Sequence, residues 1–340
     1  MFSLLFAGRA SHHSCPNACA RALQKTKNEE ELKGIEERLA DAKENLGDME
    51  VRDFLLEKSE FYARIGDKEA ALEAYDATYE KSASLGTKLD LVFAKIRLGL
   101  FCNDLELVKK QIEAATDLLN TGGDWERRNR LKVYEGLYLM TIRDFKKAAE
   151  LLLSALATFT CTELFTYERF VFYTTTLSLV ALDRKTLREK VIKAPEILSV
   201  MDKIDHLGPL MKNLYDSNYS GFFEALVGIS ATVKSDCHMS RHYRYFVREI
   251  RVVAYKQFLE SYRTVTIDAM AKEFGVSTSF LDTEISHFIA AGRLTAKIDK
   301  VAGAIESNRP DVVNAHYQKT IKQGDQLLDS IQKLARVTHV

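Results

Sequence analysis

Apolar residues recur at steps of three and four from Glu50 onward, a spacing that places them on one helix face and predicts a helical chain. A longer period overlies this pattern. Four aspartates, Asp67, Asp104, Asp144 and Asp183, follow one another at intervals of 37 to 40 residues, each between two apolar helical segments. An aspartate carboxylate accepts hydrogen bonds from the backbone N–H groups that open a helix. Each aspartate is therefore predicted to cap the second helix of a hairpin.

The residues around the four aspartates agree in character. The positions six residues before the aspartates are all apolar (Phe61, Leu98, Tyr138 and Leu177), and so are those two residues before (Ile65, Cys102, Ile142 and Ala181). The positions four residues after the aspartates are also apolar (Ala71, Val108, Ala148 and Leu187), as are those eight residues after (Tyr75, Ile112, Leu152 and Val191). Residues four apart share a helix face, so both helices of each hairpin are predicted to bury a stripe. One hairpin cannot cover its own stripe, and neighbours must stack. The sequence thus predicts a tetratricopeptide-like helical-repeat solenoid, with a degenerate fifth unit from Leu207 to Ile229 capped at Ser220.

After Arg241 the pattern changes. The elements predicted there are a helix at Tyr243–Ser261, a strand at Thr264–Thr266, helices at Ile267–Phe274 and Ser277–Ala291, and strands at Leu294–Ile298 and Val301–Ile305. This order of helix, strand, two helices and hairpin predicts a winged helix-turn-helix. Many winged helices bind DNA through the second helix of the motif. Here that helix has Asp282 and Glu284 but no lysine or arginine, a charge of −2 that phosphates would repel.

The chain ends in a predicted amphipathic helix from Asp311 to about Arg336, after Pro310. Its apolar residues follow steps of three and four, at Val313, Tyr317, Ile321, Leu328 and Ile331. No later segment remains to cover this stripe, which favours a helix of a partner protein as its cover. Packing of the stripe against the winged helix is the alternative.

Composition agrees with a helical, well-packed protein. Of the 340 residues, 46% are hydrophobic and only four are prolines, which suits long helices. The 48 basic and 48 acidic residues balance, without the basic excess of proteins that live on nucleic acid. A cluster at Arg127, Arg128 and Arg130 is interpreted as a solvated helix face with partners such as Tyr134. No stretch approaches about 18 apolar residues, so no membrane span is expected.

The first 28 residues lack any acidic residue, and we interpret them as a disordered leader. Potential metal ligands gather there at His12, His13, Cys15 and Cys19. No second ligand pair follows at zinc-finger spacing, so no metal site is predicted. The other cysteines stand in apolar helical patterns and are predicted to be buried, in a reducing compartment: Cys102, Cys161 and Cys237.

Motifs of catalysis are missing from the sequence. The segment from His238 to His242 lacks the glutamate of a zinc-protease motif, and the two histidines are interpreted as a surface pair. There is no phosphate-binding glycine loop and no Gly-x-Ser-x-Gly elbow. The chain is therefore predicted to be non-enzymatic, with no catalytic residues, no cofactor and no metal.

A helical-repeat solenoid running into a winged helix is the layout of the PCI-domain family, which occurs in the proteasome lid, the signalosome and a translation initiation factor. Several strings resemble a lid subunit: Gly122–Tyr134, Arg143-Asp144-Phe145, Phe159-Thr160-Cys161, Leu187–Lys193, His242-Tyr243-Arg244-Tyr245, Phe288–Leu294 and Lys297–Val301. The resemblance covers the chain from about residue 27 to its end. It departs at the start, where the family has a longer helical region.

The resemblance implies a structural scaffold of the proteasome regulatory-particle lid, in cytoplasm and nucleus, that supports ubiquitin-dependent protein degradation. PCI subunits pack through their winged helices, and their C-terminal helices gather into a bundle, so other PCI subunits are the expected partners. Residues expected at such interfaces are Val313, Tyr317, Ile321, Leu328, Ile331, Lys297, Asp299 and Lys300. Nucleic acid, membranes and small-molecule substrates are not expected as partners. The alternatives are a PCI subunit of the signalosome and a nucleic-acid-binding winged-helix protein.

The predicted fold class is all-α, and four segments are expected. They are a leader at 1–28, the solenoid at 29–230, the winged-helix part of the PCI domain at 231–310 and a C-terminal assembly helix at 311–340.

Overall fold

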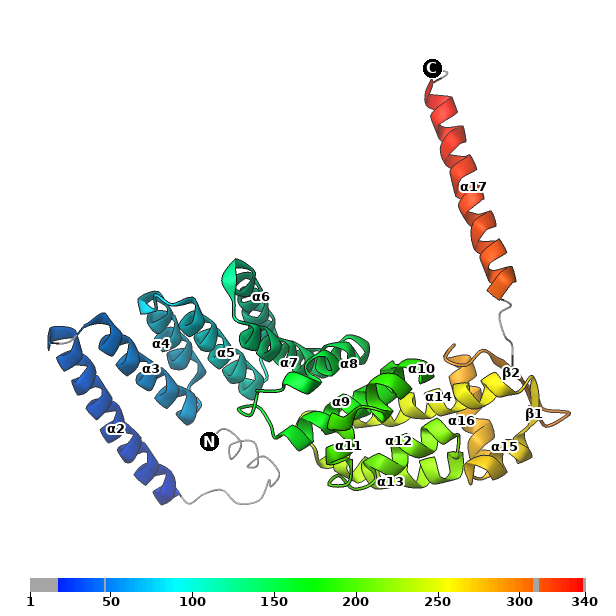
Figure 1. The fold of residues 1–340 in the computed structure, drawn as a ribbon, viewed down its shortest axis with the longest axis horizontal. Helices are drawn as coiled ribbons and strands as arrows, with labels where there is room; N and C mark the ends of the chain where they lie inside the picture. Colours follow the sequence, from blue (N-terminus) through cyan, green and yellow to red (C-terminus); the bar gives the residue numbers. More distant parts are fainter. Residues whose placement is uncertain (1–17, 46, 308–311, 339–340) are drawn as a thin grey trace. The chain divides into compact units, whose positions relative to one another are not determined.

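The computed structural model describes residues 18–45, 47–307 and 312–338, and these residues are mostly helical, as predicted (Figure 1). The chain divides into two compact units. The first contains the residues up to Lys212 together with Val227–Phe246. The second contains Asn213–Leu226 together with the residues from Val247 onward.

The first unit is built of antiparallel helices that pack against their neighbours in the chain, as Figure 1 shows for α3 to α8. The helices are α2 (Ala18–Asn45), α3 (Asp48–Ile65), α4 (Lys68–Lys81), α5 (Leu85–Cys102), α6 (Leu105–Gly122), α7 (Trp125–Ile142) and α8 (Phe145–Ser154). Contacts join α3 to α4, α5 to α6 and α7 to α8, and also α4 to α5 and α6 to α7. Hairpins thus stack one on the next, which confirms the predicted helical repeats.

Three of the four predicted aspartate caps form hydrogen bonds. The carboxylates of Asp67, Asp104 and Asp144 accept from backbone N–H groups three residues later, at 3.3, 3.1 and 3.4 Å. Asp183 stands before the four-residue helix α10 (Arg184–Leu187), but its side chain makes no cap bond. Asp104 also lies 2.5 Å from the Lys68 ammonium, which ties one hairpin's cap to the preceding hairpin.

The second helix of each hairpin buries the stripe that the sequence predicts. All eight residues four and eight positions after the aspartates are buried: Ala71, Val108, Ala148, Leu187, Tyr75, Ile112, Leu152 and Val191. The stripe two residues before the aspartates is wrongly predicted, because Ile65, Cys102 and Ile142 are exposed. These three residues end α3, α5 and α7, where the chain turns, so their side chains lie at the edge of the hairpin.

The repeats become irregular after α8. The chain continues through a 3-10 turn at Leu156–Thr158, α9 (Tyr167–Ala181), α10, a π turn at Arg188–Ile192 and α11 (Pro195–Met201). The expected fifth hairpin is formed by α12 (Leu207–Asp216) and α13 (Tyr219–Ser235). Its predicted cap is wrong: Asn218 accepts from the Gly221 amide at 3.3 Å, and Ser220 lies inside the helix. Asn218 directly precedes the first helical residue, so its side chain reaches the amides that Ser220 was expected to satisfy.

A charged network links α5, α7 and the segment before α9. Arg97 lies 3.0 Å and Arg130 2.7 Å from the Glu163 carboxylate, which also accepts from the Tyr134 hydroxyl at 2.5 Å. Burial alone would raise the pKa of Glu163, but Arg97, the Tyr134 hydroxyl and Arg130 outweigh it and hold that pKa below 4.5. The interpretation of the arginine cluster as a solvated face is therefore wrong for Arg130. Arg127 pairs with Asp90 at 2.9 Å.

A second set of polar contacts in the first unit joins the 3-10 turn Ser240–His242 to residues at the ends of α5 and α7. The Arg241 guanidinium donates to the Asn103 side chain at 2.5 Å, and the Arg143 guanidinium donates to Nδ1 of His242 at 2.9 Å. Nε2 of His242 lies 3.0 Å from the Thr141 carbonyl. With Nδ1 accepting and Nε2 donating, His242 is the neutral tautomer. We call this set of contacts the clasp.

His242 is buried, with 6% of its surface exposed, so its interpretation as part of a surface pair is wrong. Its hydrogen bonds with Arg143 and Thr141, at the end of α7, join residues 99 and 101 positions apart in the sequence, which the spacing to His238 does not indicate. Burial lowers the pKa of His242 below its ordinary value of 6.5, and the charge of Arg143 lowers it further.

The second unit contains the winged helix. Its elements are α14 (Tyr243–Ser261), which begins in the first unit, β1 (Thr264–Thr266), α15 (Ile267–Phe274), α16 (Thr278–Ala290), β2 (Ala296–Asp299) and β3 (Ala304–Ser307). The sheet order is β1-β3-β2, all antiparallel. Ser277 caps α16 and Gly275 ends α15 with a left-handed φ of 66°, as predicted. Strand β2 begins two residues later than predicted, and β3 begins three residues later, because residues 300–303 form the turn between them.

Aromatic packing places part of α13 in this second unit. Tyr219 stacks on Phe274 with ring centroids 4.6 Å apart, and Phe274 also contacts Tyr255 at 5.1 Å. The predicted segment boundary between residues 230 and 231 therefore falls inside a helix whose first part packs with the winged helix.

Two expectations about the N-terminal and cysteine residues need correction. Helix α2 begins at Ala18, so residues 18–28 are helical and not part of a disordered leader. Alanine, leucine, glutamine and lysine, strong helix formers, fill this stretch and join it to the helix that follows. Residues 1–17, with His12, His13 and Cys15, lie outside the described residues. Cys161 is buried as predicted, but Cys102 and Cys237 are exposed, since each stands beside a turn.

The caps yield a prediction with an internal control. Asp67→Ala removes a cap bond and is expected to lower the free energy of unfolding by about 1 kcal/mol. Asp183→Ala removes a carboxylate from the equivalent position, where no cap bond exists. This variant is expected to lower the free energy of unfolding by only about a few tenths of a kcal/mol. Urea unfolding followed by circular dichroism measures both; equal losses would show that the bond to the Ala70 amide stabilises nothing.

The clasp predicts a pH dependence of stability. The folded pKa of His242 is below its unfolded value, so the unfolded chain binds a proton first as the pH falls. The stability from neutral His242 is complete above about pH 6.5 and is lost as the pH decreases through the unfolded pKa toward the folded one. His242→Gln keeps an amide donor for the Thr141 carbonyl and does not titrate. Between about pH 7.5 and pH 5.5, wild-type stability is expected to fall more than that of the variant. Parallel unfolding curves at these pH values test this, and identical pH slopes would contradict it.

Candidate protein-interaction surfaces

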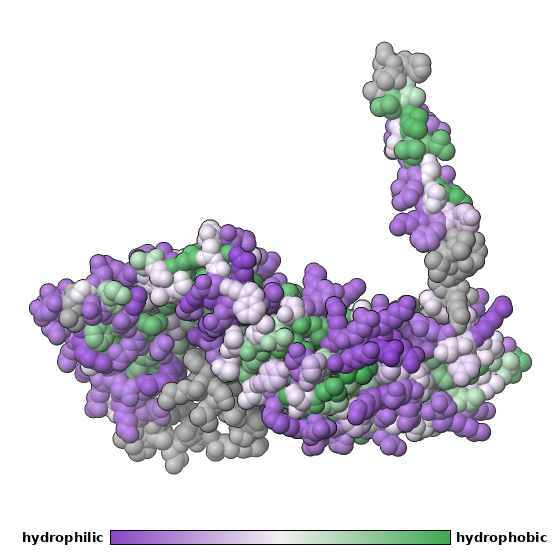
Figure 2. All heavy atoms as spheres, viewed as in Figure 1, coloured by the Kyte–Doolittle hydropathy of each residue, from purple (hydrophilic) through white to green (hydrophobic). Residues whose placement is uncertain are grey.

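The C-terminal helix α17 (Val312–Thr338) exposes the apolar stripe that the sequence predicts. Five of the eight proposed interface residues stand on this helix. Four of these five have described side chains, and all four are more than half exposed: Tyr317 63%, Ile321 56%, Leu328 57% and Ile331 51%. The Val313 side chain lies outside the described residues. Leu327 and Leu334 are exposed as well, at 64% and 66%, and Figure 2 shows this hydrophobic surface along the C-terminal half of the helix.

The stripe occupies one side of α17. Tyr317, Ile321, Gly324, Leu328 and Ile331 follow one another at intervals of four, three, four and three residues, so they keep to one face. Polar residues such as Lys322, Gln326 and Lys333 occupy the opposite face. Exposed apolar faces of this kind on helices are typical of surfaces that associate with another apolar surface.

The wing places the other three proposed interface residues near one turn. Lys297 and Asp299 stand on β2, and Lys300 begins the turn to β3; all three are exposed. The carboxylate of Asp299 accepts from the amides of Val301 and Ala302, at 2.9 and 3.2 Å, and so holds the turn in shape. Val301 is 99% exposed at the tip. Asp299 thus has a structural role in the wing, while the two lysines and Val301 form an exposed surface that is partly charged and partly apolar.

The α16 surface lacks the features of DNA readout. Thr278–Ala290 contains no lysine or arginine. Of its two acidic residues, Glu284 faces its own unit, where it pairs with Arg251 at 2.5 Å and accepts from the Tyr255 hydroxyl at 2.6 Å. The −2 charge that the sequence predicts is thus partly neutralised within the fold. Phe280 is 43% exposed on this helix, which is more typical of a protein contact than of a phosphate contact.

The described residues contain no group of three or more histidine, cysteine, aspartate or glutamate residues that could hold a metal ion. None of the helices in the described ranges combines the length and apolar character that crossing a membrane requires.

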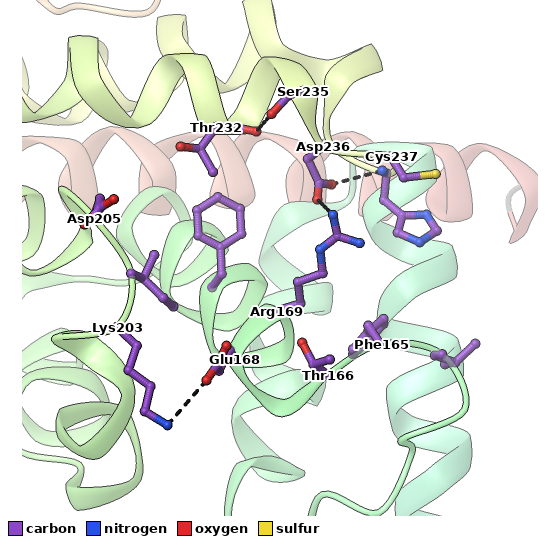
Figure 3. A pocket seen from close by; sticks show the side chains of 14 residues that line it. Phe165, Thr166, Glu168, Arg169, Lys203, Asp205, Thr232, Ser235, Asp236 and Cys237 are labelled. Carbon is purple, nitrogen blue, oxygen red and sulfur yellow. Dashed lines mark hydrogen bonds and ion pairs between the residues drawn. The ribbon is translucent and has the colours of Figure 1, made fainter. Parts of the chain in front are cut away.

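A pocket in the first unit, lined in part by Arg169, Lys203 and Asp236, was missed by sequence reasoning (Figure 3). Its residues come from three separate segments, and no local motif marks them.

Three family models match the chain, in the order of its architecture. The model for 26S proteasome subunit RPN7 matches residues 21–190, and that for the PCI domain matches residues 214–309. The model for the 26S proteasome regulatory subunit RPN7/PSMD6 C-terminal helix matches residues 316–337. The resemblance to the PCI family is confirmed. The third match contains Tyr317, Ile321, Leu328 and Ile331.

Whole-chain comparisons agree with these matches. The 26S proteasome non-ATPase regulatory subunit 6 homolog of Arabidopsis thaliana is 54% identical over 310 residues, which cover 91% of this chain and 80% of that protein. The 26S proteasome regulatory subunit RPN7 of Saccharomyces cerevisiae is 41% identical over 312 residues, 90% of this chain and 73% of that protein.

A signalosome protein is similar over a smaller part. COP9 signalosome complex subunit 1 of Arabidopsis thaliana is 26% identical over 149 residues, 44% of this chain and 34% of that protein. The similarity to proteasome subunits is therefore both higher and more extensive. The chain belongs to the family of 26S proteasome regulatory subunits that comprises RPN7 and non-ATPase regulatory subunit 6.

Proposed function

We propose that this chain is a structural scaffold subunit of the proteasome regulatory-particle lid, which it joins through its PCI module and its C-terminal helix. In that role it supports ubiquitin-dependent protein degradation without carrying out a reaction itself. Its relatives are named regulatory subunits of the 26S proteasome. Its partners are other PCI subunits of the lid, in the cytoplasm and the nucleus.

One observation carries this proposal: the apolar face of α17 is exposed in a segment that matches a family of C-terminal helices. Burying a leucine or isoleucine side chain stabilises an association by about 1.5–3 kcal/mol. Several such residues on one face give a helix bundle enough favourable free energy to control assembly. A scaffold needs such surfaces, whereas an enzyme needs a site in which reactive groups converge.

The proposal excludes other classes of partner on chemical grounds. Nucleic acid would find no basic surface on α16, and the chain has no net positive charge. No small-molecule substrate and no cofactor is part of the proposed role. Assembly into the signalosome is the less favoured alternative, because similarity to its subunit 1 covers less than half of the chain.

The apolar face of α17 yields a test of assembly. Leu328→Asp combined with Ile331→Asp places two charges where the proposed bundle is apolar, and recovery of the chain in the complex is expected to fall at least about tenfold. The melting temperature of the isolated chain is expected to stay unchanged, because both side chains are already exposed. Affinity purification of tagged chains, with PCI-domain partners quantified by mass spectrometry, measures the recovery.

A matched control adds the same charge to the other face of α17. Gln326→Asp combined with Ser330→Asp is expected to assemble like the wild type, since neither residue belongs to the apolar stripe. Early melting of the Leu328/Ile331 variant would mean that the helix packs on its own chain. Normal assembly of a folded Leu328/Ile331 variant would mean that the stripe is not an interface.

The winged helix is expected to bind protein and not DNA. In a titration of labelled duplex at low salt, binding weaker than about 1 µM with a shallow salt dependence is expected, because α16 has no basic residue to release counterions. Fluorescence anisotropy of the duplex measures this. Tighter binding that weakens steeply with salt would support a nucleic-acid-binding function instead.

A further inference from the structure

The clasp places two exposed arginines beside one buried imidazole. The Arg143 guanidinium donates to Nδ1 of His242, and the Arg241 guanidinium donates to the Asn103 side chain. Burial lowers the pKa of His242, and the charges of Arg143 and Arg241 lower it further, so both guanidiniums act on the same ring. Positive charge from two separate segments of the chain is therefore gathered at this edge of the first unit.

The carboxylates that stand next to the clasp in the sequence are already matched by lysines. Asp104 lies 2.5 Å from the Lys68 ammonium, and Asp144 lies 3.3 Å from the Lys147 ammonium. Both carboxylates also accept a backbone hydrogen bond as helix caps. These two aspartates therefore do not cancel the charges of the clasp arginines.

Other acidic side chains are matched elsewhere too. Asp236, the acidic residue that most closely precedes Arg241 in the sequence, is buried and lies 3.8 Å from Arg169 (Figure 3). The contacts of the clasp arginines in the described part of the chain are with uncharged groups, including the Tyr245 ring, 5.8 Å from the Arg143 guanidinium. Both positive charges are thus left for an anion from outside the chain.

Each clasp arginine keeps hydrogen-bond donors for such an anion. A guanidinium has five N–H groups in a planar fork, and the clasp uses Nε of Arg143 and Nη1 of Arg241. The remaining N–H groups of such a fork match the oxygens of a phosphate or a carboxylate in pairs. The clasp can therefore hold its own turn in place and bind an anion at the same time.

The backbone of the clasp is strained where its side chains are used. The residues that end α3, α5 and α7 in the left-handed conformation are Gly66, Asn103 and Arg143, with φ of 90°, 59° and 74°. Glycine adopts this conformation without cost, but asparagine and arginine do so at some expense. Strain of this kind is common at ligand sites, and here both strained residues contribute their side chains to the clasp.

Exposed apolar side chains flank the charged centre. Ile142, directly before Arg143, is 47% exposed, and Phe101, two residues before Asn103, is 37% exposed. A small free ion would have no use for them, whereas a segment of a protein could place an apolar side chain there. The surface therefore suits an anionic group that is carried on a polypeptide.

We propose that the clasp binds a phosphorylated segment of a partner protein, in which the phosphate of a phosphoserine or phosphothreonine accepts hydrogen bonds from Arg143 and Arg241 and an adjacent apolar side chain packs on Ile142. A phosphate monoester carries a charge of about −1.5 to −2 and three acceptor oxygens, which matches two guanidiniums better than a single carboxylate does. The inference goes beyond the proposed scaffold function, which requires no phosphorylated partner.

A direct test uses the isolated full chain with ¹³C-labelled histidine at about pH 7.5, where the phosphate is mainly dianionic. The probe is the tetrapeptide Gly-phosphoserine-Leu-Gly, blocked at both ends. The readout is the NMR resonance of the His242 ring, identified by its loss in His242→Gln. A saturable shift is expected. The serine peptide is expected to leave the resonance in place, and the aspartate peptide to bind about tenfold more weakly, because it offers less charge and fewer acceptors.

Arg143→Gln and Arg241→Gln are each expected to weaken binding of the phosphopeptide about tenfold, since each removes one charged hydrogen-bonded pair. Arg143→Lys keeps the charge but not the fork, and is expected to weaken binding about threefold. Arg128→Gln is the matched control. Arg128 is exposed and donates to a carbonyl, that of Leu119, but it stands at the opposite end of α7, about 22 Å from Arg143 along the helix. Melting temperatures verify that all variants are folded.

The proposal is overturned if the His242 resonance does not respond to the phosphopeptide, if the serine peptide binds equally, or if Arg128→Gln weakens binding as much as Arg143→Gln and Arg143→Lys do. Inorganic phosphate that binds as tightly as the phosphopeptide would assign the site to a free ion. An aspartate peptide that binds as tightly would assign it to an acidic segment. Either result would also overturn the proposal, and none of these outcomes bears on assembly through α17.

Discussion

A helical hairpin exposes an apolar stripe on each side, and the first unit depends on covering these stripes by stacking. The second helix of each hairpin buries residues four and eight positions after the capping aspartate, with Ala71 and Ala148 fully covered. Small residues at these positions let neighbouring helices approach closely, and larger ones such as Tyr75 and Leu152 fill the space between them. The half-buried charges of Arg97, Arg130 and Glu163 compensate one another inside this stack, which offsets the cost of removing them from water.

Periodic features of this fold are predictable from the sequence because they arise from local geometry. Asp67 and Ser277 cap their helices as predicted, since a cap requires only a side chain next to the first turn. The same logic fails for Ile65 and Ile142, which fit the apolar period but end their helices beyond the reach of the next hairpin. Periodicity records the face of a helix on which a residue stands, but not whether a neighbour extends far enough to cover it.

The candidate surfaces also differ in whether local helix geometry or long-range contacts determine them. The apolar face of α17 follows from helix geometry, and the structure leaves it exposed. The environment of His242 and the pocket at Arg169 and Asp236 could not be predicted, because their contacts join residues far apart in the sequence. The charge of α16 could be counted from the sequence, yet the pairing of Glu284 with Arg251 could not, so its external field is weaker than its composition indicates.

The clasp has a consequence for how the chain acquires its structure during synthesis. Asn103 meets a partner 138 residues later, and Arg143 meets one 99 residues later. At synthesis rates of about 5–20 residues per second, the turns after α5 and α7 leave the ribosome several seconds or more before Arg241 and His242 do. A repeat array can normally grow from one end, each hairpin completing the one before it. Here the hydrogen bonds of the clasp can form only after residue 242 has emerged, so the hairpins that leave the ribosome first lack these contacts until two long loops close.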